Sequence, residues 1–207
     1  MTDFVDTMRL KGQGEEDTWF ARHDRELVDA LHHRPKGPTQ ALTIVSGGQT
    51  GVDRAALDTA LALGLAVGGW CPLGRRAEDG PIPRRYPLRE TPTQDYAQRT
   101  EWNVRDSDAT LILFRARLTG GSARTAEHAD RLGRLLLTLD LDAAPDPALA
   151  ADWVRRQGVR VLNVAGPRES GAPGIYAQAR GWLETLFRLC AQGGTQVPAG
   201  QRAGGKE

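Results

Sequence analysis

Two glycine-rich stretches of this sequence have the composition of turns that hold a phosphate. They are SGGQTGVD, from Ser46 to Asp53, and TGGSARTAEH, from Thr119 to His128. Each follows an apolar segment and precedes a helical pattern, so the free N–H groups and the positive dipole end of a helix would point at the turn. The first stretch has no P-loop lysine, which favours a mono- or diphosphate, or another compact anion, over a triphosphate with magnesium.

The candidate binding residues combine glycines with small hydrogen-bonding side chains. Glycine lets the backbone approach a ligand and adopt positive φ angles, and the hydroxyl and amide groups add neutral hydrogen bonds. An alternative interpretation is that the glycines only permit tight strand-to-helix turns. Two such turns at one place favour ligand binding. The candidates are Gly47, Gly48, Gln49, Thr50 and Gly51 of the first turn, and Thr119, Gly120, Gly121, Ser122 and Thr125 of the second.

Two charged residues of the second stretch have alternative roles. Arg124 could pair with a phosphate, although an arginine in a first helical turn more often faces solvent. Glu127 lies one turn into the predicted helix, where the helix dipole favours a carboxylate. In a functional role Glu127 would hold a sugar hydroxyl or act as an acid or base.

The segment from Cys71 to about Pro92 is a long loop rich in proline, glycine and arginine. Long loops inside compact domains are often functional, so this one is expected to be either a lid over the crevice or a solvated excursion. We interpret Cys71 as structural, because no base or second ligand is identifiable near it. The four histidines and two cysteines form no metal-binding pattern, and no metal ligands are predicted.

Apolar strands alternate with helices along the chain, which indicates a parallel sheet covered on both faces. We predict an α/β, doubly wound, mainly parallel, Rossmann-like domain. The strand order is expected to reverse beside the first strand, with segment 109–114 as its neighbour and both glycine turns beside one crevice. Asp53 is expected to cap the first helix and Gly64 to end it. Strands are expected at 42–46, 65–70, 109–114, 135–139 and 159–164, and helices at 54–63, 93–106, 123–134, 147–157 and 174–190.

Residues 41–191 are predicted to form this single domain. Residues 1–40 are expected to be an N-terminal helical extension, because a loose apolar stripe there ends at a Pro-Lys-Gly-Pro break. Residues 192–207 are expected to be a disordered tail, since they are rich in glycine and polar residues.

The overall composition limits the partners and the compartment. The chain of 207 residues is 40% hydrophobic and 26% charged, with a net charge of +1. The balanced charge gives no general attraction to nucleic acid or anionic membranes, so anion binding must be local. No apolar run approaches a membrane span, and the first residues do not form a signal peptide. Two isolated cysteines are typical of a reducing compartment, so a cytoplasmic location is expected.

Five long segments between Ala41 and Leu189 resemble the putative molybdenum carrier family. That family belongs to a Rossmann-like superfamily with the molybdenum cofactor carrier proteins, the Lonely Guy phosphoribohydrolases and the DNA-processing protein A fold. The matching segments are SGGQTGVDRAALDTAL, GGWCPLGRRAEDGPIPRRYPLRET, YAQRTEWNVRDSDATLIL, LTGGSARTAEHA and VLNVAGPRESGAPGIYAQAR.

This resemblance implies a crevice for molybdenum cofactor or a nucleotide-like phosphate ligand. In molybdenum cofactor the dithiolene of the pterin holds the metal, so the protein needs an anion pocket rather than a cysteine or histidine cluster. The resemblance also implies a homo-oligomer. A binding or carrier protein for a small phosphorylated ligand is therefore the leading hypothesis.

Two alternatives follow from other relatives. The Lonely Guy pattern PGGxGTxxE matches at Gly120, Gly121 and Glu127, but Thr119, Ala123 and Arg124 depart from it. By that resemblance the protein would be a phosphoribohydrolase-like N-glycosidase acting on a nucleoside monophosphate, with Glu127 as its catalytic carboxylate. A single-stranded nucleic-acid-binding module ranks last, because the charge is balanced and the crevice loops have little aromatic content.

Overall fold

The computed structural model describes residues 42–192. The predicted N-terminal extension at 1–40, and all but the first residue of the predicted tail at 192–207, lie outside this range.

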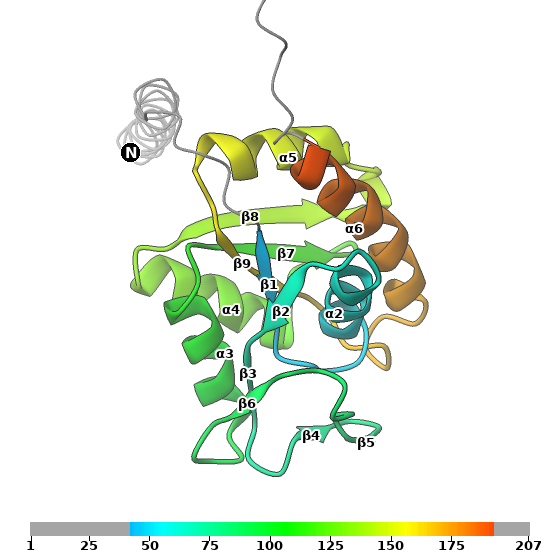
Figure 1. Ribbon diagram of the computed structural model, residues 1–207. Helices are drawn as coiled ribbons and strands as arrows, with labels where there is room; N and C mark the ends of the chain where they lie inside the picture. The colour runs from blue at the N-terminus through cyan, green and yellow to red at the C-terminus, as the bar shows by residue number, and fades with distance from the viewer. Residues whose placement is uncertain (1–41, 193–207) are drawn as a thin grey trace, which may run out of the picture. The chain divides into compact units, whose positions relative to one another are not determined.

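Five parallel strands form the central sheet, in the order β2-β1-β9-β7-β8 (Figure 1). The strands are β1 (Thr43–Val45), β2 (Ala66–Gly68), β7 (Ala109–Phe114), β8 (Leu135–Asp140) and β9 (Val161–Ala165). Every neighbouring pair is parallel, and helices connect the strands in sequence. The predicted α/β, doubly wound, Rossmann-like fold is confirmed.

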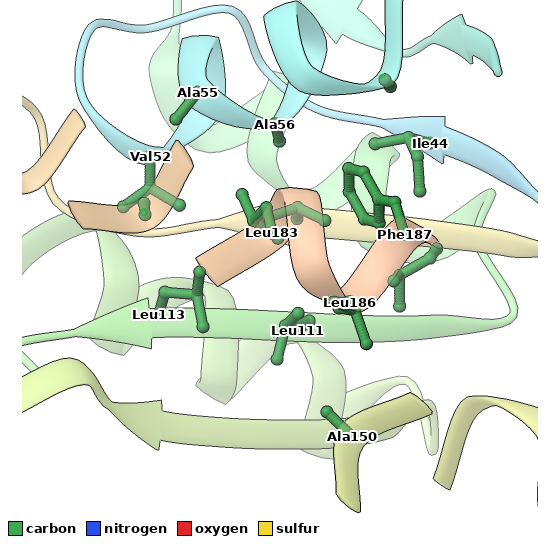
Figure 2. Packing of buried hydrophobic residues seen from close by; sticks show 14 of the residues in the cluster. Ile44, Val52, Ala55, Ala56, Leu111, Leu113, Ala150, Leu183, Leu186 and Phe187 are labelled. Carbon is green, nitrogen blue, oxygen red and sulfur yellow. The ribbon is translucent and has the colours of Figure 1, made fainter. Parts of the chain in front are cut away.

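Helices cover both faces of the sheet. They are α2 (Val52–Ala62), α3 (Tyr96–Arg105), α4 (Gly120–Arg131), α5 (Pro147–Arg156) and α6 (Ile175–Gln192), with a short 3-10 helix at Leu141–Ala143. Helix α6 packs against α2 and α5 on one face, and α3 packs against α4 on the other (Figure 1). The larger hydrophobic core fills the first of these layers, where Leu111, Leu183 and Phe187 lie together (Figure 2).

The strand next to β1 across the sheet is β9, and the prediction that 109–114 would be this neighbour is wrong. Ile44 of β1 pairs with Leu162 of β9, and Thr110 of β7 pairs with Asn163 on the other side of β9. Both β7 and β9 are buried on both faces. Their apolar patterns therefore give no information about which one lies beside β1.

The segment 71–92 contains short paired strands and its own small hydrophobic cluster, so it is not a loop without secondary structure. It contains β3 (Trp70–Cys71) paired with β6 (Arg89–Glu90), and β4 (Arg76–Ala77) paired with β5 (Gly80–Pro81). A second small hydrophobic cluster supports it, formed by Leu57, Cys71, Ile82, Tyr86 and Leu88. Burial raises the pKa of the Cys71 thiol, which agrees with the structural role predicted for this cysteine.

One arginine organises this segment. The Arg75 guanidinium donates hydrogen bonds to the carbonyl oxygens of Ile82, Pro83, Tyr86 and Leu88, at 2.9 to 3.1 Å. Four backbone acceptors around one cation fix the course of the chain, because each would otherwise need water or another donor.

Two predictions next to β2 and α2 need correction. The strand predicted at 65–70 is divided at Gly69, whose φ is +124° and whose missing Cβ would lie 2.3 Å from the Ser46 carbonyl oxygen. Asp53 does not cap α2, because the N-cap is Gly51 and Asp53 lies inside the first turn. Gly64, with φ +70°, follows the end of α2 as predicted.

Candidate functional site

A pocket of about 370 Å³ opens at the carboxyl ends of β1, β9 and β7, between α3 and α4. Ligands of doubly wound sheets bind at this edge. Four segments line it: Gly47, Gln49 and Asp53 after β1; Tyr96, Ala97, Arg99, Thr100 and Asn103 of α3; Arg115, Arg117, Thr119, Gly120, Gly121, Ser122, Arg124 and Thr125 after β7; and Asn163, Ala165, Gly166, Pro167, Arg168, Gly171 and Ala172 of β9 and its turn.

The pocket contains parts of both predicted glycine turns, but the turn after β9 lies between them. A Cβ on Gly166 would lie 2.4 Å from the Leu113 carbonyl oxygen, and a Cβ on Gly51 would lie 2.3 Å from that of Pro167. The turn after β9 therefore packs closely against the backbone of the first glycine turn and of strand β7. The turn after β9 is not among the predicted site residues, because β7 rather than β9 was expected beside β1.

Several backbone N–H groups of the first glycine turn already donate to other groups of the protein. The Gln49 N–H donates to the Asp53 carboxylate at 3.2 Å, and the Thr50 N–H donates to Gln49 Oε1 at 3.1 Å. The Val52 N–H donates to the Pro167 carbonyl oxygen at 3.2 Å. These donors already have acceptors, whereas the N–H groups of Gly47, Gly48 and Gly51 have none among the described residues, so the first turn offers only part of its N–H groups to a phosphate.

The side chains of Gln49 and Thr50 connect neighbouring loops. Gln49 Oε1 accepts the Glu78 N–H at 2.9 Å, and the Thr50 hydroxyl accepts the Glu169 N–H at 3.2 Å. The Thr50 hydroxyl also donates to the Glu78 carboxylate. Burial acts to raise the pKa of Glu78, but hydrogen bonds from Ser170 and Thr50 outweigh it and lower that pKa. Thr50, Gly48 and Gly51 do not line the pocket.

A buried ion pair closes this side of the pocket. Arg99 Nη1 lies 2.9 Å from Asp53 Oδ2, and the two side chains are 14% and 5% exposed. The guanidinium lies directly over Gly47, where a Cβ would lie 1.2 Å from Arg99 Nη1. Burial raises the pKa of Asp53, while Arg99 acts in the opposite direction. A side chain at position 47 would therefore displace the Arg99 guanidinium from its ion pair with Asp53.

The second glycine turn is open. Helix α4 begins at Gly120, three residues earlier than predicted, so Gly120, Gly121 and Ser122 form its first turn. A Cβ on Gly120 or Gly121 would meet no atom of the described residues within 4 Å. The N-cap Thr119 makes no side-chain capping bond. The backbone N–H groups of residues 120–122 have no acceptor in the described structure.

Two hydroxyl side chains lie beside this helix start. Ser122 is 4% exposed and lines the pocket, yet its hydroxyl makes no hydrogen bond within residues 42–192. Thr125 also lines the pocket, and its hydroxyl donates to the Gly121 carbonyl oxygen at 2.9 Å. Buried hydroxyls normally have partners, so Ser122 is left to bind a ligand or water.

Arginines dominate the charge of the pocket lining. Asp53 is the one acidic lining residue within the described range, and Arg99 neutralises it. Arg115 donates to the Pro173 carbonyl oxygen at 2.7 Å and keeps its charge. The Arg117 and Arg124 side chains are exposed and pair with no described residue. The lining therefore carries a local positive charge in a chain of net charge +1.

Glu127, the candidate catalytic carboxylate, is exposed on α4 and does not line the pocket. Among residues 42–192, no group of three histidine, cysteine, aspartate or glutamate side chains could hold a metal ion. In the same range no helix has the length and apolar character needed to cross a membrane. Among the described residues, the pocket lining thus contains no unpaired carboxylate.

A doubly wound parallel sheet with an arginine-lined crevice at the carboxyl ends of its strands defines a Rossmann-like α/β protein. The model of the circularly permutated YpsA SLOG family matches residues 44–187, and the chain belongs to this family.

A solved crystal structure supports the same assignment. The Putative molybdenum carrier protein from Syntrophus aciditrophicus SB is 44% identical to this chain, with a TM-score of 0.68. The alignment covers 73% of this chain and 97% of the other. The family resemblance noted from the sequence is confirmed. Among curated proteins there is no match.

Proposed function

We propose that this protein binds and carries a small phosphorylated molecule, molybdenum cofactor or a nucleotide-like compound, with the phosphate at the start of α4. The observation that carries the proposal is the open first turn of α4. There, three N–H groups without acceptors and the unpaired Ser122 hydroxyl line one pocket.

Physical chemistry favours an anion at this position. Free N–H groups and the helix dipole stabilise negative charge at a helix start. Arg117 and Arg124 add positive charge that no described carboxylate neutralises. Without a Cβ at Gly121, the ligand can approach the backbone closely. A volume of about 370 Å³ lies within the range of small-molecule sites.

The proposal that the protein is a carrier is supported by its similarity to the protein from Syntrophus aciditrophicus SB. The protein from Syntrophus aciditrophicus SB is named as a molybdenum carrier, and this pocket contains no lining cysteine or histidine. A pterin phosphate brings its own metal ligands, so an anion site is sufficient to hold it. A nucleotide-like ligand has the same requirement for a phosphate site.

Native mass spectrometry of the gently purified protein tests this function. An adduct with the mass of a molybdopterin or a nucleotide, identified after denaturation, is the expected result. Gly121→Asp should abolish the adduct by clash and charge. Gly181→Asp is the matched control, because Gly181 lies in α6, outside the pocket, with open space around it. An adduct that survives in Gly121→Asp would contradict this placement.

A further inference from the structure

A buried amide lies in the pocket, away from the charged turns. Asn163 is in the middle of β9, is 2% exposed and lines the pocket. Its strand neighbours Leu162 and Val164 belong to the core beneath α2 and α6. Because successive side chains of a strand alternate, Asn163 lies on the opposite face of the sheet, towards α3 and α4.

One end of this amide is held and the other is free. Asn163 Nδ2 donates to the Thr110 hydroxyl at 3.2 Å, but Oδ1 accepts no hydrogen bond from any described residue. If the amide is turned over, Thr110 can donate to the oxygen and the nitrogen becomes the free group. In either orientation, a polar atom of a buried lining residue lacks a protein partner.

Most other polar groups on this side of the pocket are paired, but Arg99 Nε is buried and has no hydrogen-bond partner among the described residues. The Asn103 amide accepts the Trp70 N–H at 2.8 Å and donates to the Trp70 carbonyl oxygen at 2.9 Å. The Asp53 and Arg99 charges neutralise each other. The arginines without described partners are exposed, whereas Asn163 is buried. The pocket thus has exposed arginines at its mouth, whereas its floor, the buried part of the lining, contains the Asn163 amide and the Arg99–Asp53 ion pair.

The wall near the mouth includes an aromatic ring. Tyr96, at the start of α3, lines the pocket and is 39% exposed. Aromatic rings of this kind provide a flat apolar surface for a planar group. A heterocycle beside Tyr96 would present its polar edge to the floor.

We propose that Asn163 determines ligand specificity by hydrogen-bonding a neutral group on the heterocycle of the bound molecule. The inference rests on the proposed function, because the phosphate at α4 fixes which end of the ligand reaches the floor. A site with a buried, unpaired amide discriminates against ligands that leave the amide unsatisfied. The charge of Arg99 at the floor is already matched by Asp53, so the site does not require a second anionic group there.

Calorimetric titration with a panel of phosphates tests this role. The probes are inorganic phosphate, ribose 5-phosphate, the four nucleoside 5′-monophosphates and a pterin phosphate. Wild-type protein should bind at least one heterocyclic probe more tightly than ribose 5-phosphate. The variant Asn163→Leu with Thr110→Val replaces the hydrogen-bonded pair by apolar side chains, so it should fold. It should reduce the heterocycle preference about tenfold, with unchanged affinity for ribose 5-phosphate.

The single variant Asn163→Asp keeps the size of the side chain and changes its hydrogen bonding. It should reorder the preference among the heterocyclic probes. Circular dichroism and thermal unfolding establish that both variants are folded.

The possible failures are distinguishable. If folded variants keep the wild-type preference, or lose all probes equally, Asn163 does not determine specificity and the phosphate site still stands. If wild-type protein binds phosphates without preference, the inference is also wrong. If wild-type protein binds none of the probes, inorganic phosphate included, the proposed function fails together with this inference.

Discussion

The two glycine turns look alike in the sequence, but in the structure they differ in how closely the rest of the protein packs against them. In the first turn, a Cβ on Gly47 or Gly51 would collide with Arg99 or with the Pro167 backbone. In the second turn, a Cβ on Gly120 or Gly121 would meet nothing within 4 Å among the described residues. The first set of glycines is required by packing within the protein. Packing within the protein does not require the second set. These glycines instead leave space in which a ligand could approach the backbone closely.

Hydrogen bonding and charge show the same contrast. The first turn donates to Asp53, Gln49 and Pro167, and its one ion pair is internal. The second turn has free N–H groups beside unpaired arginines. Substitutions in the first turn should therefore reduce stability, and substitutions in the second should reduce binding.

The largest expected effect is from Gly51→Ala. Its positive φ of +74° and the contact with Pro167 combine backbone strain with overpacking, so the free energy of unfolding should fall by about 4 kcal/mol. Gly121→Ala is the control, and its stability should be unchanged or raised by up to about 1 kcal/mol. Urea unfolding measures both. Equal losses in the two variants would remove the contrast.

Asp53→Asn should reduce stability by about 3 kcal/mol, because Arg99 would keep a mostly buried charge without its partner. A double variant with Arg99→Gln should recover part of this loss. Urea unfolding of the four proteins gives the coupling energy. Additive effects would show that the ion pair does not hold the first turn together.

Arg124→Ala should weaken phosphate binding about threefold, because an exposed charge contributes modestly to anion binding. Stability should not change. Arg131→Ala, at the far end of the same helix and outside the pocket, should bind phosphate like the wild type. Calorimetry at low salt measures the difference. Equal affinity in both variants would place the phosphate away from Arg124.

The smallest expected effect concerns acid stability. Glu78 joins Thr50 to Ser170, and its pKa is lowered from the ordinary value of 4.5. Its contribution to stability is present above the unfolded-state pKa and is lost as pH falls through the folded-state pKa. Glu78→Gln should therefore lose less stability than the wild type on acidification from neutral pH through that range.

Glu127→Gln is the control for this comparison, since Glu127 is exposed and outside the pocket. Its thermal midpoint should follow the wild-type pH dependence. If Glu127→Gln and Glu78→Gln have the same acid profile, Glu78 does not stabilise the contact between the turns.

Sequence patterns predicted the fold wherever burial alone decides it. The strand at Ala109–Phe114 matches the predicted bounds, because a strand buried on both faces is a continuous apolar run. The position of β9 could not be predicted, since β7 has the same apolar character. The local sequence pattern also could not predict that Gly47 packs against Arg99, because these two residues are distant in the sequence and come into contact only in the folded protein.

Asn163 and Thr110 had a signal in the sequence. Each is a polar residue inside an apolar strand, in VLNVA and ATLILF. Buried polar residues in such strands need a partner, so this pattern could have marked both positions as candidates. Ten candidate residues were predicted to bind ligand, and the structure places seven of them in the pocket lining: Gly47, Gln49, Thr119, Gly120, Gly121, Ser122 and Thr125.

Backbone amide NMR during titration with inorganic phosphate tests the contrast between the turns most directly. The account predicts saturable shifts at the amides of Gly120, Gly121 and Ser122, with little change from Gly47 to Gly51. Saturable shifts concentrated at Gly47 to Gly51 instead would show that the first turn holds the phosphate and would contradict the account.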